Sequence, residues 1–114
     1  MTFIREESKV SVRKPIVFVP QMVAGRNLSA ALKFGGIVSV LSEDPSPFAL
    51  GPAIEELRRT LSRYMPHDYL LLMGDPVVIG MSTMIASQQT GGVVNLLKFD
   101  RQSFDYIPVT IDIR

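Results

Sequence analysis

The sequence predicts a small three-layer α/β domain, in which helices cover both faces of a mainly parallel β-sheet. Apolar strand-like runs alternate with helix-like segments along most of the chain, as expected for a parallel sheet. The clearest junction is residues 69–80, where a buried strand-like run meets a helix across a Gly-Asp-Pro turn. Two strand-like runs near the end flank a short polar turn, which predicts an antiparallel hairpin. The expected fold is therefore Rossmann-like or flavodoxin-like.

The chain divides into a polar segment, residues 1–14, and a single domain, residues 15–114. We expect the polar segment to be an arm or a short edge strand, since Val10 and Val12 alternate with polar residues. The elements expected within the domain are strands at 16–19, 37–41 and 69–73, helices at 28–34, 51–65 and 76–89, and a hairpin of 93–99 with 104–113.

The two longer helices have different patterns. In the helix at 51–65, Ile54, Leu57, Leu61 and Tyr64 recur at helical spacing and predict one buried face. The helix at 76–89 is apolar almost all round, which predicts contact with more than one surface.

The start of the helix at 76–89 has strong local signals. Asp75 has the identity and position of an N-cap, and Pro76 stands at the first helical position. Such a turn between strand and helix lies where open α/β sheets usually bind ligands. It predicts the location of a site without defining a reaction.

Composition excludes several classes of protein. There is no cysteine, so neither a disulfide scaffold nor a cysteine-ligated metal site is expected. The net charge is +1, and aromatic residues are not interleaved with a basic patch, so nucleic-acid binding is not predicted. No apolar run approaches the roughly 20 residues of a membrane span, and no secretory signal is visible. A cytoplasmic protein is expected.

Polar residues follow the predicted strands at the carboxyl edge of the sheet. Carboxylates there could hold Mg²⁺ together with a phosphate-bearing ligand, and an aspartate could instead bind a ribose hydroxyl. The same acids could also be a helix cap and solvated loop residues. The candidate ligand-binding residues are Gln21, Arg26, Glu43, Asp44, Asp75 and Arg101.

No catalytic residue is predicted. His67 precedes the third strand and is therefore expected at the opposite end of the sheet from these acids. The sequence has no nucleophile elbow, P-loop or dinucleotide fingerprint. Resident cofactors are not expected, and Mg²⁺ belongs only to the ligand-binding alternative.

Protein association is predicted by the helix at 76–89 and the last strand. Gly80, Thr83 and Ser87 form a line of small side chains that would permit close approach, and Met84 adds an adaptable apolar surface. Pro108 within the last strand predicts an edge strand or a bulge, and an edge strand could also pair with another chain. Core packing would explain the same apolar pattern.

The runs at 68–80, 94–101 and 106–109 resemble a group of small uncharacterised phage-encoded proteins, with similarity across residues 15–113. The resemblance implies a bacterial-virus protein made in the host cytoplasm, and it transfers no catalytic residue. The sequence-based hypothesis is a non-enzymatic binding protein that self-associates or binds a host or virion protein. The alternative is a small-ligand or nucleotide-binding protein.

Overall fold

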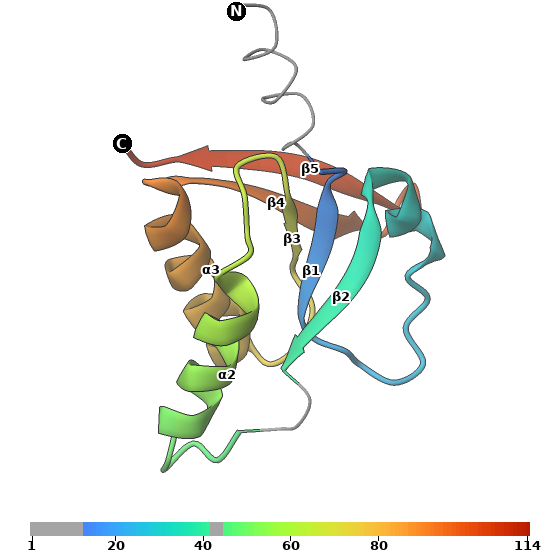
Figure 1. The fold of residues 1–114 in the computed structure, drawn as a ribbon. Helices are drawn as coiled ribbons and strands as arrows, with labels where there is room; N and C mark the ends of the chain where they lie inside the picture. The colour runs from blue at the N-terminus through green and yellow to red at the C-terminus, as the bar shows by residue number, and fades with distance from the viewer. Residues whose placement is uncertain (1–12, 42–44) are drawn as a thin grey trace, which may run out of the picture.

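The computed structural model describes residues 13–41 and 45–114, which form a five-stranded sheet with helices on both faces (Figure 1). The strands are β1 (Ile16–Gln21), β2 (Gly36–Leu41), β3 (Tyr69–Leu71), β4 (Val93–Asp100) and β5 (Asp105–Asp112). The helices are the 3₁₀ helix η1 (Ser29–Phe34) and the α-helices α2 (Gly51–Leu61) and α3 (Pro76–Thr90). Residues 1–12 of the arm or edge strand expected at 1–14 lie outside the described residues.

The sheet has the strand order β2-β1-β3-β4-β5. Strands β1 to β4 are parallel, and β5 pairs with β4 in the antiparallel direction. The prediction of a mainly parallel α/β sheet with a C-terminal hairpin is confirmed. Because β1 lies inside the sheet, its apolar run is covered on both faces.

Alternate side chains of the central strands build two hydrophobic clusters. Phe18 and Leu70 pack under α2 and α3, together with Leu57 and Leu61 of α2. Val17, Val19 and Leu71 face the other side, where η1 covers them. Figure 1 shows α2 and α3 on one side of the sheet and η1 near the opposite side.

Helix α2 is shorter than predicted, because it ends at Leu61 and not near Met65. The N–H groups of Arg63 and Tyr64 donate to carbonyls three residues back, so the α-helical ladder has already ended when the N–H of Met65 donates to the side chain of Asp68 at 2.8 Å. Tyr64 is buried in the turn that follows the helix. The apolar spacing in the sequence therefore extends beyond the last helical residue. The predicted short helix at 28–34 is a 3₁₀ helix, and Asn27 accepts a hydrogen bond from the N–H of Ser29 at 2.9 Å.

Helix α3 begins as its sequence predicts. The Asp75 side chain accepts a hydrogen bond from the N–H of Val77 at 2.9 Å, and Pro76 is the first helical residue. Gly91 ends the helix with φ of 70°, a left-handed conformation that glycine adopts at little cost. The hydroxyl groups of Ser82 and Thr83 donate to carbonyls one turn earlier, so both are satisfied on an apolar helix.

Strand β5 is an edge strand, as Pro108 predicted. The N–H of Ile113 donates to the carbonyl of Gly92 at 2.9 Å. Hydrogen-bonded pairs alternate along an antiparallel ladder, so residues 107, 109 and 111 also bond to β4, while Pro108 has its backbone facing outward. The missing N–H of Pro108 therefore removes no bond within the sheet.

No helix in the described part of the chain is both long enough and apolar enough to cross a bilayer.

Candidate functional site

The carboxyl edge of the sheet brings two of the candidate ligand-binding residues together. The N–H of Asp75 donates to Oε1 of Gln21 at 2.8 Å. Gly74 between strand and helix has φ of 121°, and an added Cβ there would lie 2.6 Å from the Cβ of Gln21. Gln21 thus holds the turn that carries Asp75, and the contact itself is structural.

Asp75 also lines a cavity of about 360 Å³ with Pro45, Pro47, Leu50 and Val77. This wall is mostly apolar, and one oxygen of the carboxylate already accepts the bond that caps α3. Glu43 and Asp44 lie outside the described residues. Among the described residues, no group of three His, Cys, Asp or Glu side chains is placed to hold a metal ion.

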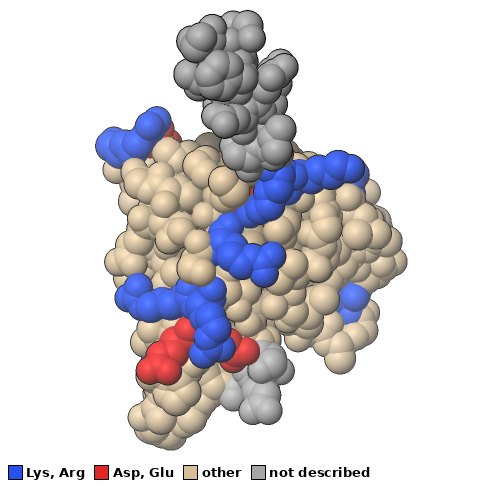
Figure 2. Space-filling view, in the orientation of Figure 1, with Lys and Arg blue, Asp and Glu red and all other residues tan. Residues whose placement is uncertain are grey.

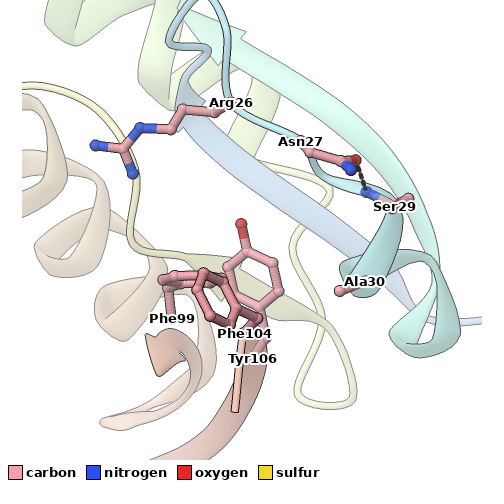
Figure 3. Close-up of a pocket in the computed structure, with 7 residues that line it drawn as sticks. All are labelled: Arg26, Asn27, Ser29, Ala30, Phe99, Phe104 and Tyr106. Carbon is pink, nitrogen blue, oxygen red and sulfur yellow. Dashed lines mark hydrogen bonds between the residues drawn. The ribbon is translucent and has the colours of Figure 1, made fainter. Parts of the chain in front are cut away.

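Arg26 lies in a separate cavity of about 270 Å³, between the loop that follows β1 and the β4–β5 hairpin (Figure 3). Its other lining residues include Asn27, Ser29, Phe99, Phe104 and Tyr106. Figure 3 shows the guanidinium of Arg26 on one side of the cavity and the three aromatic rings on the other.

The three aromatic rings form a connected cluster. Phe99 and Tyr106 are directly opposed in the β4–β5 register, and their ring centroids lie 5.3 Å apart. The ring centroids of Phe99 and Phe104 lie 6.3 Å apart. Tyr106 is 6% exposed, and its hydroxyl points into the cavity. Burial raises the pKa of that hydroxyl, and the positive charge of Arg26 lowers it in part.

Phe104 has an unusual backbone conformation. Its φ is 53°, and it is the one non-glycine residue with positive φ in the described part of the chain. Its side chain is 76% exposed. A bulky residue in this region of backbone space is rare and is typical of positions where the surroundings impose the conformation.

Arg101 lies in the exposed hairpin turn and does not line this cavity. Asp100 beside it accepts hydrogen bonds from the hydroxyl and the N–H of Ser103, and these bonds lower the pKa of Asp100. These residues organise the turn. The predicted ligand-binding residues therefore do not form one site. Gln21 and Asp75 lie together at the start of α3, whereas Arg26 lines a separate cavity.

The association candidates on α3 lie on the other face of the sheet. Thr83, Met84 and Ser87 of α3 line a cavity of about 330 Å³ with Val94, Ile111 and Ile113. Gly80 lies one turn earlier on the same exposed side of α3. Pro108 belongs to the opposite set of β5 side chains, because it alternates with Ile107 and Val109.

We define the α3–β5 face as the exposed or half-exposed side chains of both elements and of Ile113, which follows β5. They are Val77, Gly80, Thr83, Met84 and Ser87 with Ile107, Val109, Ile111 and Ile113. Met84 is 67% exposed and Ile113 is 71% exposed. None of these residues is charged.

Figure 2 shows basic side chains in a nearly continuous run across the upper middle of the face in view. A second basic group lies below this run beside acidic side chains, and other basic groups stand apart near the edges of the face.

The sequence predicted only part of the cavity at Arg26, because its aromatic residues are scattered along the chain. The predicted hairpin contained a usable signal, since Phe99 and Phe104 flank its turn closely. The sequence placed Arg26 at the same edge of the sheet as Arg101 of the hairpin turn, but it did not single out the aromatic residues beside that turn. The contact between η1 and β5 that builds the cavity arises in the tertiary fold.

No curated protein and no solved structure matches this chain significantly. The family model for phage Pam3 gp32-like proteins matches residues 12–113, which is nearly the whole chain. The expected similarity to phage-encoded proteins is confirmed. The chain belongs to the family of phage Pam3 gp32-like proteins.

Proposed function

We propose that this phage protein is a non-enzymatic binding protein that acts in the host cytoplasm and whose first partner is a second copy of itself. The α3–β5 face would form the interface. The observation that carries the proposal is the uncovered apolar side of β5. Ile107, Val109 and Ile111 point to the side of the sheet that α2 and α3 occupy, yet no described helix covers them.

An uncharged face of this kind needs an apolar partner. Isolated exposed apolar residues are ordinary, whereas a contiguous patch on a helix and an adjacent strand is typical of an interaction site. Lys98, which pairs with Ile107, is the charged neighbour at one end. A partner selected by opposite charge is therefore not favoured by the residues of this face.

A second copy fits the arrangement of helix and strand. Each copy presents the uncovered side of β5 beside the exposed apolar side of α3. A two-fold axis through an isologous interface would place α3 of each copy over β5 of the other. The small side chains of Gly80, Thr83 and Ser87 would allow the two copies to approach closely.

Packing of faces is favoured over addition of strands at the edge. The backbone of Pro108 faces outward at the middle of β5 and has no N–H to donate. A strand pairing along that edge would lose a central hydrogen bond, and proline at an edge commonly prevents such pairing.

The test measures the mass of the protein in solution by light scattering across a range of concentrations. We expect a dimer for the native chain and a monomer for Ile111→Lys, since a lysine would be buried without a partner. The matched control is Leu32→Lys, which places the same charge at an exposed leucine of η1. A native monomer, or an Ile111→Lys dimer of unchanged stability, would refute the interface.

A second variant separates assembly from folding. An added Cβ at Gly80 meets no atom within 4 Å, so Gly80→Leu is accommodated within one copy. We expect it to remain folded, as shown by circular dichroism, and to lose self-association. A folded Gly80→Leu protein that still dimerises would exclude this part of α3 from the interface.

A further inference from the structure

The cavity at Arg26 is separate from the α3–β5 face, because Phe99 and Tyr106 belong to the η1 side of the sheet. We propose that it binds a small aromatic anion, in which one ring system carries one phosphate or carboxylate group. A nucleoside monophosphate is the member of this class that we select as the probe. The proposal does not depend on self-association.

The polar groups of the cavity favour an anion. Arg26 provides guanidinium donors, and no described carboxylate lies within ion-pair distance of it. The oxygen of the Asn27 amide already accepts the N–H of Ser29, which leaves its NH₂ group available to donate. None of the described residues lining the cavity is acidic. A phosphate or carboxylate would meet donors and no opposing charge.

The aromatic residues favour a planar ring. Phe104 is largely exposed while its edge-to-face contact with Phe99 fixes its position, so a ligand ring can stack against it. The hydroxyl of Tyr106 points into the same space, and no described residue forms a hydrogen bond with it (Figure 3). The positive φ of Phe104 holds this ring at the rim at a cost in backbone energy.

The size of the cavity limits the ligand. About 270 Å³ is just below the range of about 300–1,000 Å³ found for small-molecule pockets. One ring and one anionic group match this volume, whereas a dinucleotide would not be enclosed. Tyr106 at the base belongs to the same buried hydrophobic cluster as Leu97 and Ala31, so the cavity has a packed floor.

The experiment titrates the full chain with adenosine 5′-monophosphate by calorimetry or NMR. Adenosine, inorganic phosphate and an oligothymidylate are titrated separately. We expect a dissociation constant below about 1 mM for the monophosphate and binding at least about tenfold weaker for adenosine or phosphate alone. Binding of the oligonucleotide without binding of the monophosphate would overturn the proposal and indicate a single-stranded nucleic acid instead.

Two variants and two controls assign the site. Arg26→Gln and Phe104→Leu should each weaken monophosphate binding at least about tenfold, while Arg101→Gln and Phe48→Leu should leave it unchanged. All four positions are exposed, so unfolding is not expected. The proposal fails if the monophosphate does not bind, or if its binding survives both Arg26→Gln and Phe104→Leu.

Discussion

Arg13 holds the buried carboxylate of Asp68 with two guanidinium hydrogen bonds, of 2.7 and 2.5 Å, at the amino edge of the sheet. The backbone N–H groups of Ile16 and Met65 each donate to the same carboxylate at 2.8 Å. The ring of His67 forms a 2.8 Å hydrogen bond with the carbonyl of Arg13. One carboxylate therefore joins the start of β1, the end of α2 and the start of β3. His67 is part of this structural junction, at the end of the sheet where the sequence placed it.

Replacing Asp68 with alanine should lower the free energy of unfolding by about 3 kcal/mol, because it leaves two backbone donors and the guanidinium of Arg13 without their acceptor. Urea denaturation measures the change. Asp112→Ala is the control, since it removes an exposed ion pair with Arg114 and should have a much smaller effect. Equal losses for the two variants would contradict a special role for Asp68.

The same carboxylate should make stability depend on pH in the acid range. Burial by itself would raise the pKa of Asp68, but the hydrogen bonds from Arg13, Ile16 and Met65 lower it below its ordinary value. The unfolded chain, with a pKa of about 3.9, therefore takes up the proton first as the pH falls.

The stabilisation by Asp68 is thus complete above about pH 4 and is lost as the pH falls through the lowered pKa of the folded state. We expect the stability difference between the native chain and Asp68→Asn to shrink over that interval. Unfolding curves at a series of pH values would measure it. A difference that stays constant down to the lowest pH would show that Asp68 is not ionised in the fold.

The N-cap of α3 should contribute about 1 kcal/mol to the free energy of unfolding. Asp75→Ala removes the acceptor for the N–H of Val77, while Asp75→Ser retains a capping oxygen. Thermal unfolding should rank the native chain close to Asp75→Ser and above Asp75→Ala. If both variants lost the same stability, the carboxylate charge and not the cap would be responsible.

Two glycines should respond in opposite directions to alanine. Gly74→Ala should cost more than about 1 kcal/mol, because its φ of 121° strains an L residue and the new Cβ would lie 2.6 Å from the Cβ of Gln21. Gly80→Ala lies in open space within α3 and should stabilise the monomer by up to about 1 kcal/mol. Chemical denaturation of both variants at low protein concentration tests the pair.

Phe104→Asn should raise the stability of the fold by up to about 1 kcal/mol, since asparagine tolerates a positive φ better than phenylalanine does. Phe48→Asn changes an exposed phenylalanine that has no positive φ and serves as the control. Melting temperatures of the two variants would show the difference. A destabilised Phe104→Asn protein would mean that the ring contributes more by packing on Phe99 than its backbone costs.

Local signals in the sequence were sufficient for most elements. The cap at Asp75 and the edge position of β5 depend on a few adjacent residues, and the structure confirms both. The end of α2 was predicted too late, because the chain tightens into a turn after Leu61 and the N–H of Met65 then donates to Asp68. That contact depends on the position of Asp68, which directly precedes β3 in the folded sheet.

The sequence by itself determined the fold class and the uncharged character of α3, because hydrophobic periodicity and turn residues act over short distances along the chain. Only the tertiary structure decided the strand order, the exposure of β5 beside α3, and the meeting of Arg26 with the aromatic residues of the hairpin. These features depend on which strands pair and on which helices cover them. Such pairings are selected by the packing of the whole core, which no local pattern encodes.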